Sequence, residues 1–100
     1  MENIRMYGTI FSMKVKPGHE DKIIELLRSD NDIPKGGVAF FLMQPDKKDE
    51  MIGVAVFESK EAHINNANRP EQNEFFMKIM EHLIEEPKWT DGDYVLGEVI

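Results

Sequence analysis

The sequence predicts a single α+β domain with the element order βαββα(α)β and a four-stranded antiparallel sheet. Short apolar runs bounded by Gly, Pro and Asp alternate with stretches whose apolar residues recur at helical spacing. The two runs in the middle of the chain, 38–43 and 51–57, are apolar on both of their faces. With 100 residues, the chain is long enough for one domain, which we place over 1–100.

The first strand is predicted over residues 7–16 and the first helix directly after it. One face of this strand is largely apolar, whereas the other becomes polar toward Lys14. Pro17-Gly18 ends the strand. Glu20 and Asp21 suit the first turn of a helix, because carboxylates are favoured at the positive end of the helix dipole. The apolar residues of this helix, which is expected to end near residues 28–29, are Ile23, Ile24, Leu26 and Leu27.

A hairpin is predicted next, with strands over 38–44 and 51–57 joined by the polar connection 45–50. Right-handed crossovers place both sets of helices on the same side of the sheet, so they cover only one face of this hairpin. A second copy of the chain, packed sheet against sheet, is expected to cover the other face. A bound ligand and the C-terminal tail are the alternative covers. The sequence does not tell which set of side chains faces the helices: Val38, Phe40 and Leu42 lie opposite Ala39, Phe41 and Met43, and Ile52, Val54 and Val56 lie opposite Met51, Ala55 and Phe57.

Two helices and a last strand are predicted in the remainder. Ser59 can cap a short helix over 60–66, and Asn68 with Pro70 provides a second helix start. The second helix is expected to continue to Pro87, because an apolar stripe runs along it. Asp91-Gly92 is predicted to be a turn leading into a strand over 93–100. The stripe consists of Phe75, Phe76, Ile79, Met80, Leu83 and Ile84.

Composition narrows the classes of function. The formal net charge of −7 argues against nucleic acid and anionic membranes as partners. The absence of Cys excludes thiolate chemistry and Cys-ligated metals, and the three scattered His residues predict no metal site. The longest apolar run, 38–43, is far too short to span a bilayer, and the first residues lack the order of a signal peptide. We therefore expect a cytoplasmic protein.

Several segments resemble the antibiotic biosynthesis monooxygenase family. They are MKVKPG at 13–18 with the helix after it, VAVFESKEA at 54–62, PEQ at 70–72 and EEPKWTDG at 85–92. The resemblance implies a ferredoxin-like subunit, a dimeric α+β barrel and a cavity between the sheet and the helices. Some members oxidise phenols or quinols there with O₂ and without metal or flavin. Others degrade haem, and others have no known activity.

The resemblance can be examined for haem. Haem-degrading relatives use an Asn on the first strand, a Trp in the helix after the third strand and a His iron ligand in the last helix. The matching positions here are Phe11, Asn66 and Phe76. All three depart from that pattern, so haem degradation is not expected and no cofactor is predicted.

The resemblance places His63 and Asn66 near the mouth of the cavity. A neutral imidazole accepts a proton near neutral pH, and an amide can hold a substrate oxygen. These two residues are therefore the candidate catalytic pair, although a surface histidine and a helix-end asparagine are the simpler interpretation. We expect a set of aromatic residues in the core, some of which would also form walls of the cavity. These are Phe11, Phe41, Phe75, Phe76 and Trp89.

Two classes of function follow. The first is a cofactor-independent monooxygenase acting on a small electron-rich aromatic or quinol. The second is a non-catalytic dimeric barrel that binds a small apolar ligand in a stress or regulatory role; a ligand-binding subunit of a larger assembly remains a third option. No complete set of nucleophile, base and orienting group stands out in the sequence, so the enzymatic hypothesis depends on the resemblance.

Overall fold

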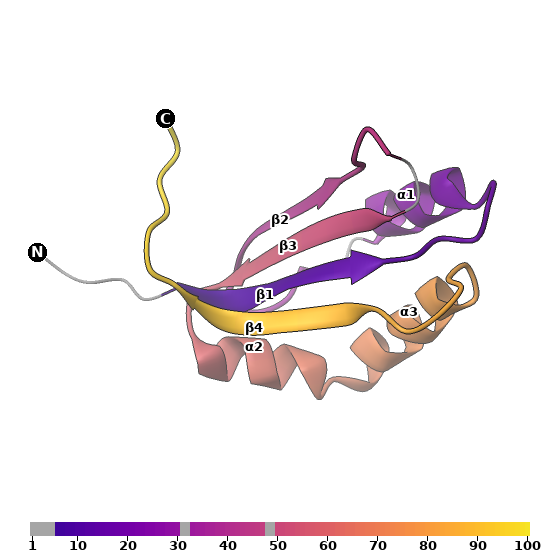
Figure 1. Ribbon diagram of the computed structural model, residues 1–100. Coiled ribbons are helices and arrows are strands. Elements are labelled where there is room, and N and C mark those ends of the chain that lie inside the picture. Colours follow the sequence, from indigo (N-terminus) through magenta and orange to yellow (C-terminus); the bar gives the residue numbers. More distant parts are fainter. Residues whose placement is uncertain (1–5, 31–32, 48–49) are drawn as a thin grey trace, which may run out of the picture.

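The computed structural model describes residues 6–30, 33–47 and 50–100. Its elements follow the predicted order: β1 (Met6–Met13), α1 (Glu20–Ser29), β2 (Gly37–Met43), β3 (Met51–Phe57), α2 (Lys60–Ala67), α3 (Pro70–Met80) and β4 (Lys88–Tyr94). The strands form one sheet in the order β2-β3-β1-β4, and every neighbouring pair is antiparallel. The three helices lie on one side of this sheet, behind it in Figure 1. This is the ferredoxin-like α+β arrangement.

The core lies between the sheet and the helices. Ile23 of α1 and Ile79 of α3 pack against residues that alternate along β1, in agreement with the predicted strand face. Ile23 is fully buried, and Met51 of β3 is nearly so. Burial of each such side chain contributes about 1.5–3 kcal/mol, which makes this layer the main source of stability. The core cluster comprises Phe11, Met13, Val15, Ile23, Met51, Ile79 and Leu83.

The helix starts largely follow the predicted signals. The Ser59 hydroxyl accepts a hydrogen bond from the Ala62 amide at 3.0 Å and caps α2 as expected. Pro70 occupies the first turn of α3, but the residue before it, Arg69, holds the cap position. The prediction of Asn68 as the cap is therefore wrong: Asn68 ends α2 instead, where its amide bonds to carbonyls of the preceding turn.

Helix α3 ends at Met80, earlier than its apolar stripe predicts. The chain then turns back to β1: Leu83 forms an isolated antiparallel bridge with Val15, and the Ile84 amide donates to the Lys14 carbonyl at 2.8 Å. Leu83 keeps its predicted core position by this bridge rather than by helix geometry. Ile84, in contrast, is exposed.

The last strand differs most from expectation. The polar segment Lys88–Tyr94 pairs with β1, so Asp91 and Gly92 lie within the strand and form no turn. Of the strand predicted over 93–100, only the first two residues belong to β4, and residues 95–100 extend away from the sheet as a tail (Figure 1). The apolar side chains of this tail are almost fully exposed: Val95, Leu96, Val99 and Ile100.

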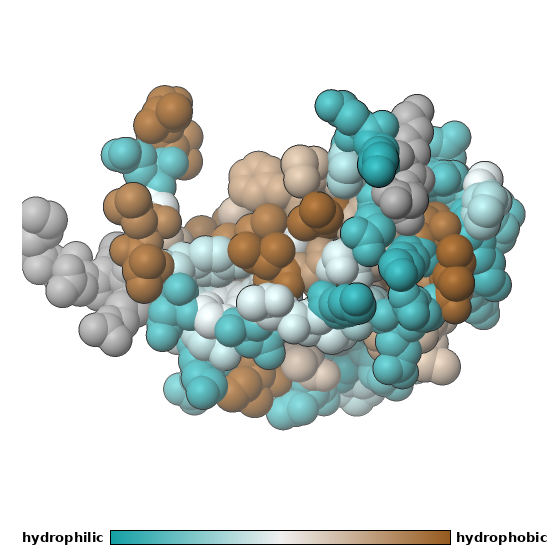
Figure 2. Space-filling view, in the orientation of Figure 1, coloured by the Kyte–Doolittle hydropathy of each residue, from teal (hydrophilic) through white to brown (hydrophobic). Residues whose placement is uncertain are grey.

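The helices leave the opposite side of the sheet uncovered, and we call it the open face. Alternation along the paired strands places on it Ile10, Ala39, Phe41, Met43, Ile52, Val54, Val56 and Tyr94. Phe41 is 66% exposed. Figure 2 looks onto this face, where hydrophobic patches lie between the tail and a more polar end. Among the described residues, no helix is long and apolar enough to cross a membrane.

Tyr94 anchors the end of β4 on the open face. Its hydroxyl donates to the Ala55 carbonyl at 2.9 Å and also contacts the Thr9 carbonyl at 3.3 Å. Its ring lies over Gly8, where an added Cβ would come within 3.0 Å of the ring. Burial raises the pKa of the Tyr94 phenol, which keeps the hydroxyl in its donating form. These contacts span β1 and β3 and tie β4 to the sheet.

Candidate functional site

Aromatic side chains gather between the sheet and α3. The Phe11 ring lies 5.0 Å from Trp89 and 6.2 Å from Phe40, between centroids. Trp89 in turn lies 5.9 Å from Phe76 of α3. We call these four residues, Phe11, Phe40, Phe76 and Trp89, the aromatic cluster. Because three strands and a helix contribute to it, the cluster forms a continuous apolar surface on the helix side of the sheet.

Gly53 makes room for the centre of this cluster. It is the residue of β3 opposite Phe11, and a Cβ there would lie 2.1 Å from the Phe11 ring. The missing side chain therefore lets the ring lie across the neighbouring strand. Phe11 is buried, whereas Trp89 and Phe40 are about half exposed.

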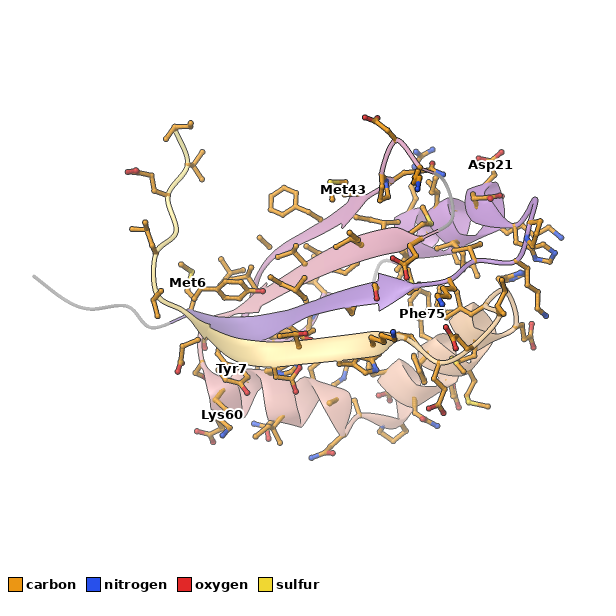
Figure 3. All side chains as sticks on the ribbon, in the orientation of Figure 1. Met6, Tyr7, Asp21, Met43, Lys60 and Phe75 are labelled. Carbon is orange, nitrogen blue, oxygen red and sulfur yellow. The ribbon has the colours of Figure 1, made fainter. Side chains whose placement is uncertain are left out.

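His63 lies at one end of the same face. Its ring is 5.5 Å from that of Tyr7 on β1 and 5.2 Å from that of Phe57 on β3. The side chain is half-buried and turned toward the sheet. Figure 3 shows Tyr7 close to α2, where the Lys60 ammonium lies 5.9 Å from the Tyr7 ring centroid. A positive charge thus lies over Tyr7, the ring that also contacts His63.

Asn66 is one turn further along α2, on the same face as His63. Its carbonyl oxygen Oδ1 accepts a hydrogen bond from Nη1 of Arg69 at 2.9 Å. Arg69 also lies 3.7 Å from the Glu71 carboxylate, between Nε and Oε2. The bond to Arg69 fixes the orientation of the Asn66 amide and leaves its NH₂ group as a donor.

The remaining predicted wall residues, Phe41 and Phe75, lie outside the aromatic cluster. Phe41 pairs with Val54 and lies on the open face, because it follows Phe40 and strand side chains alternate. It therefore does not line the same space as Phe11. Phe75, labelled in Figure 3, packs against the core and borders a cleft on the outer side of α3 together with Arg69 and Lys78. Its neighbour Phe76 instead contacts Trp89.

Tyr7, Phe40 and Phe57 also belong to this face, and of these three only Phe57 was not considered for the cavity from the sequence. The alternation along β1 places Tyr7 on the same face as Phe11, and that signal was visible in the sequence. The contacts of Phe57 with His63 and of Phe40 with Phe11 depend on strand register, which the sequence does not specify. Within the described residues, no group of three or more His, Asp or Glu side chains is placed to hold a metal ion.

Comparisons with known proteins agree with this architecture. The profile of a family described as "Antibiotic biosynthesis monooxygenase" matches residues 6–78. A monooxygenase from the gene ActVA-Orf6 of Streptomyces coelicolor, solved with the ligand nanaomycin D, has a TM-score of 0.80 at 17% identity. The alignment covers 99% of this chain and 95% of that one. No protein with a curated description matches the chain significantly.

Two further solved structures are similar. A Chloroflexus aurantiacus protein described in the terms of the same family has a TM-score of 0.73 at 23% identity, over 94% of this chain and 96% of that one. A conserved protein from Methanosarcina mazei Go1 has a TM-score of 0.78 at 13% identity, over 89% and 92%. At these identities the structural likeness is evidence of the fold alone.

Proposed function

Because the chain belongs to the antibiotic biosynthesis monooxygenase family, we propose that it is a cofactor-independent monooxygenase. Its substrate would be a small electron-rich aromatic or quinol, oxidised with O₂ in the space between the sheet and the helices. The observation that carries the proposal is the position of His63, at the end of a face that the aromatic cluster lines. An apolar surface with one titratable group at its edge suits an aromatic substrate that must lose a proton.

In the proposed reaction His63 removes the phenolic proton of the substrate. The resulting anion transfers electrons to O₂, one oxygen atom enters the ring, and the other leaves as water with hydrogens from the substrate. The substrate supplies every electron that O₂ takes up, so the balance needs no further reductant. The NH₂ group of Asn66 and the nearby Lys60 ammonium would stabilise the substrate anion.

The spacing along β1 favours a substrate with more than one ring. Tyr7, beside His63, and Phe11, in the aromatic cluster, are four residues apart on this strand. That separation corresponds to about 13 Å. A substrate that both reaches His63 and packs on Phe11 and Trp89 is therefore elongated.

Oxygen uptake with a panel of quinols and phenols of one to three rings tests this function. We expect the His63→Gln variant to lose about 10²–10⁴-fold in turnover, as is typical for a positioned base. The control is His82→Gln, which changes a histidine remote from α2. An active wild type whose rate is unchanged in both His63→Gln and Asn66→Ala would move the site elsewhere. No uptake with any compound would favour the non-catalytic, ligand-binding alternative.

We also propose that two copies associate through their open faces. The support is the apolar character of that face together with the exposure of Phe41, Met43 and Ile10. A monomer of this size would leave these side chains in water, whereas a face-to-face dimer buries them.

A further inference from the structure

A second concave surface lies between α1 and β2, next to the aromatic cluster. This α1–β2 cleft has a volume of about 300 Å³. It is lined by Ile24, Leu27, Arg28, Phe40, Leu42, Gln44 and Met51. The volume is at the small end of the range for ligand pockets, which limits an occupant to a small molecule.

The lining combines an apolar floor with one cation. Five of its side chains are apolar, and Phe40 contributes a half-exposed ring that is suited to stacking. Arg28, in the last turn of α1, is the one charged residue among the described residues of the lining, and Gln44 adds an amide. An apolar body with a single anionic group complements this surface.

From this complementarity we propose that the α1–β2 cleft binds a small aromatic carboxylate. The ring lies on Phe40, Leu42 and Leu27, and the carboxylate accepts hydrogen bonds from the Arg28 guanidinium and the Gln44 amide. The formal charge of −7 on the whole chain disfavours anions in general, so recognition depends on this local cation. The site goes beyond the proposed oxygenation, because His63 lies at the other end of β3, against Phe57.

The cleft shares Phe40 with the aromatic cluster. One side of this residue faces Phe11 at 6.2 Å between centroids, and the residue also lines the cleft. Occupancy of the cleft can therefore alter the packing of the cluster. A ligand in the cleft would not contact His63, which is not part of the lining.

Methyl NMR on protein labelled at the methionine methyl groups tests the proposal, with 2-naphthoate as the probe and 2-naphthylmethanol as its neutral analogue. Met51 lines the cleft, whereas Met43 lies on the open face and Met77 is exposed on α3. We expect 2-naphthoate to shift the Met51 signal saturably and to leave the Met43 and Met77 signals in place. The neutral analogue should bind more weakly.

Variants of α1 separate recognition of the anion from apolar adsorption. Arg28→Gln should weaken 2-naphthoate about three- to tenfold and leave 2-naphthylmethanol unchanged, and Arg28→Lys should restore part of the loss. Lys22→Gln removes the other cation of α1, which lies outside the cleft, and should change neither probe.

Three outcomes would overturn the proposal. These are an unmoved Met51 signal, equal binding of both probes to the wild type, and equal loss in Arg28→Gln and Lys22→Gln. Quenching of Trp89 fluorescence without a shift of Met51 would place the probe in the aromatic cluster and would also overturn it. None of these measurements depends on oxygen uptake, so they are independent of the proposed catalysis.

Discussion

At the scale of single residues, Gly53 sets the shape of the aromatic cluster. A methyl group at this position would collide with the Phe11 ring at 2.1 Å, and that ring is held between Trp89 and Phe40. We expect Gly53→Ala to destabilise the protein by about 1–3 kcal/mol, the usual cost of overpacking. It should also change the Trp89 emission, since Phe11 must move.

Urea denaturation followed by Trp89 fluorescence checks this prediction. Gly92→Ala is the matched control, because Gly92 also lies in a strand but an added Cβ there would meet nothing within 4 Å. Equal stability of the two variants would mean that Phe11 moves aside at no cost.

A pair of histidines makes stability depend on pH. The Nδ1 atoms of His19 and His82 lie 2.9 Å apart and share one hydrogen bond, which requires at least one neutral ring. The pKa of His19 lies below its ordinary 6.5, chiefly because of burial and also because of positive charge on Lys22, His82 and Lys16. The carboxylate of Glu20 acts in the opposite direction. The unfolded chain thus binds more protons than the folded one just below pH 6.5. Stability from this pair is present above that pH and is lost as the pH falls through this window.

We therefore expect the free energy of unfolding to fall between pH 7 and pH 5.5 in the wild type. His19→Asn should show a flatter profile, because the titrating group is gone. Carboxylates titrate at lower pH and are common to both proteins, so denaturation curves at several pH values isolate the histidine contribution. Parallel profiles for wild type and variant would assign the pH dependence to other groups.

At the scale of elements, α2 positions the candidate catalytic pair and depends on its cap. The Ser59 hydroxyl satisfies the Ala62 amide, and α2 has no buried residue of its own. We expect Ser59→Ala to destabilise the protein by about 1 kcal/mol and to speed hydrogen exchange in the first turn of α2. Ser29→Ala, at the exposed end of α1, is the control with little expected effect. Unchanged exchange in α2 would show that contacts of His63 with Tyr7 and Phe57 hold the helix without the cap.

Elements whose signals are local could be predicted from the sequence, and those that depend on distant pairing could not. The short apolar run of β3, with polar residues before and after it, predicts its bounds, Met51–Phe57, correctly. Strand β4 has the polar sequence KWTDGDY, and its place depends on pairing with β1 and on the contact of Trp89 with Phe11. In the same way, α3 ends where Leu83 bridges to Val15. The local sequence pattern therefore predicts a helix that continues beyond Met80 and a strand that lies beyond most of β4.

The expectations for the candidate site divide in the same way between local signals and distant pairing. Helix signals and the family resemblance together indicated His63 and Asn66, and alternation indicated the face of Phe11. The error at Phe41 arises because adjacent phenylalanines on a strand point to opposite faces, and composition alone does not tell which one lines the interior.

At the scale of the whole molecule, the open face and the tail leave more apolar surface uncovered than a stable monomer is expected to carry. The tail residues Val95, Leu96, Val99 and Ile100 extend from the edge of the sheet, next to the open face (Figure 2). Exposed apolar patches of this kind mark association sites. A two-fold dimer through the open face would bury Phe41, Ile10 and Val54 at the centre of the contact, since these residues lie on the neighbouring strands β2, β1 and β3.

A charge at the centre of this face should therefore separate the copies. We expect sedimentation equilibrium at micromolar concentration to give a dimer for the wild type and a monomer for Phe41→Asp, because an unpaired carboxylate buried in an apolar contact costs several kcal/mol. Met77→Asp places the same charge at a comparably exposed apolar residue on α3, away from the open face, and should remain a dimer. Circular dichroism shows whether each variant stays folded. A well-folded wild-type monomer, or equal dissociation of both variants, would remove the open face as the interface.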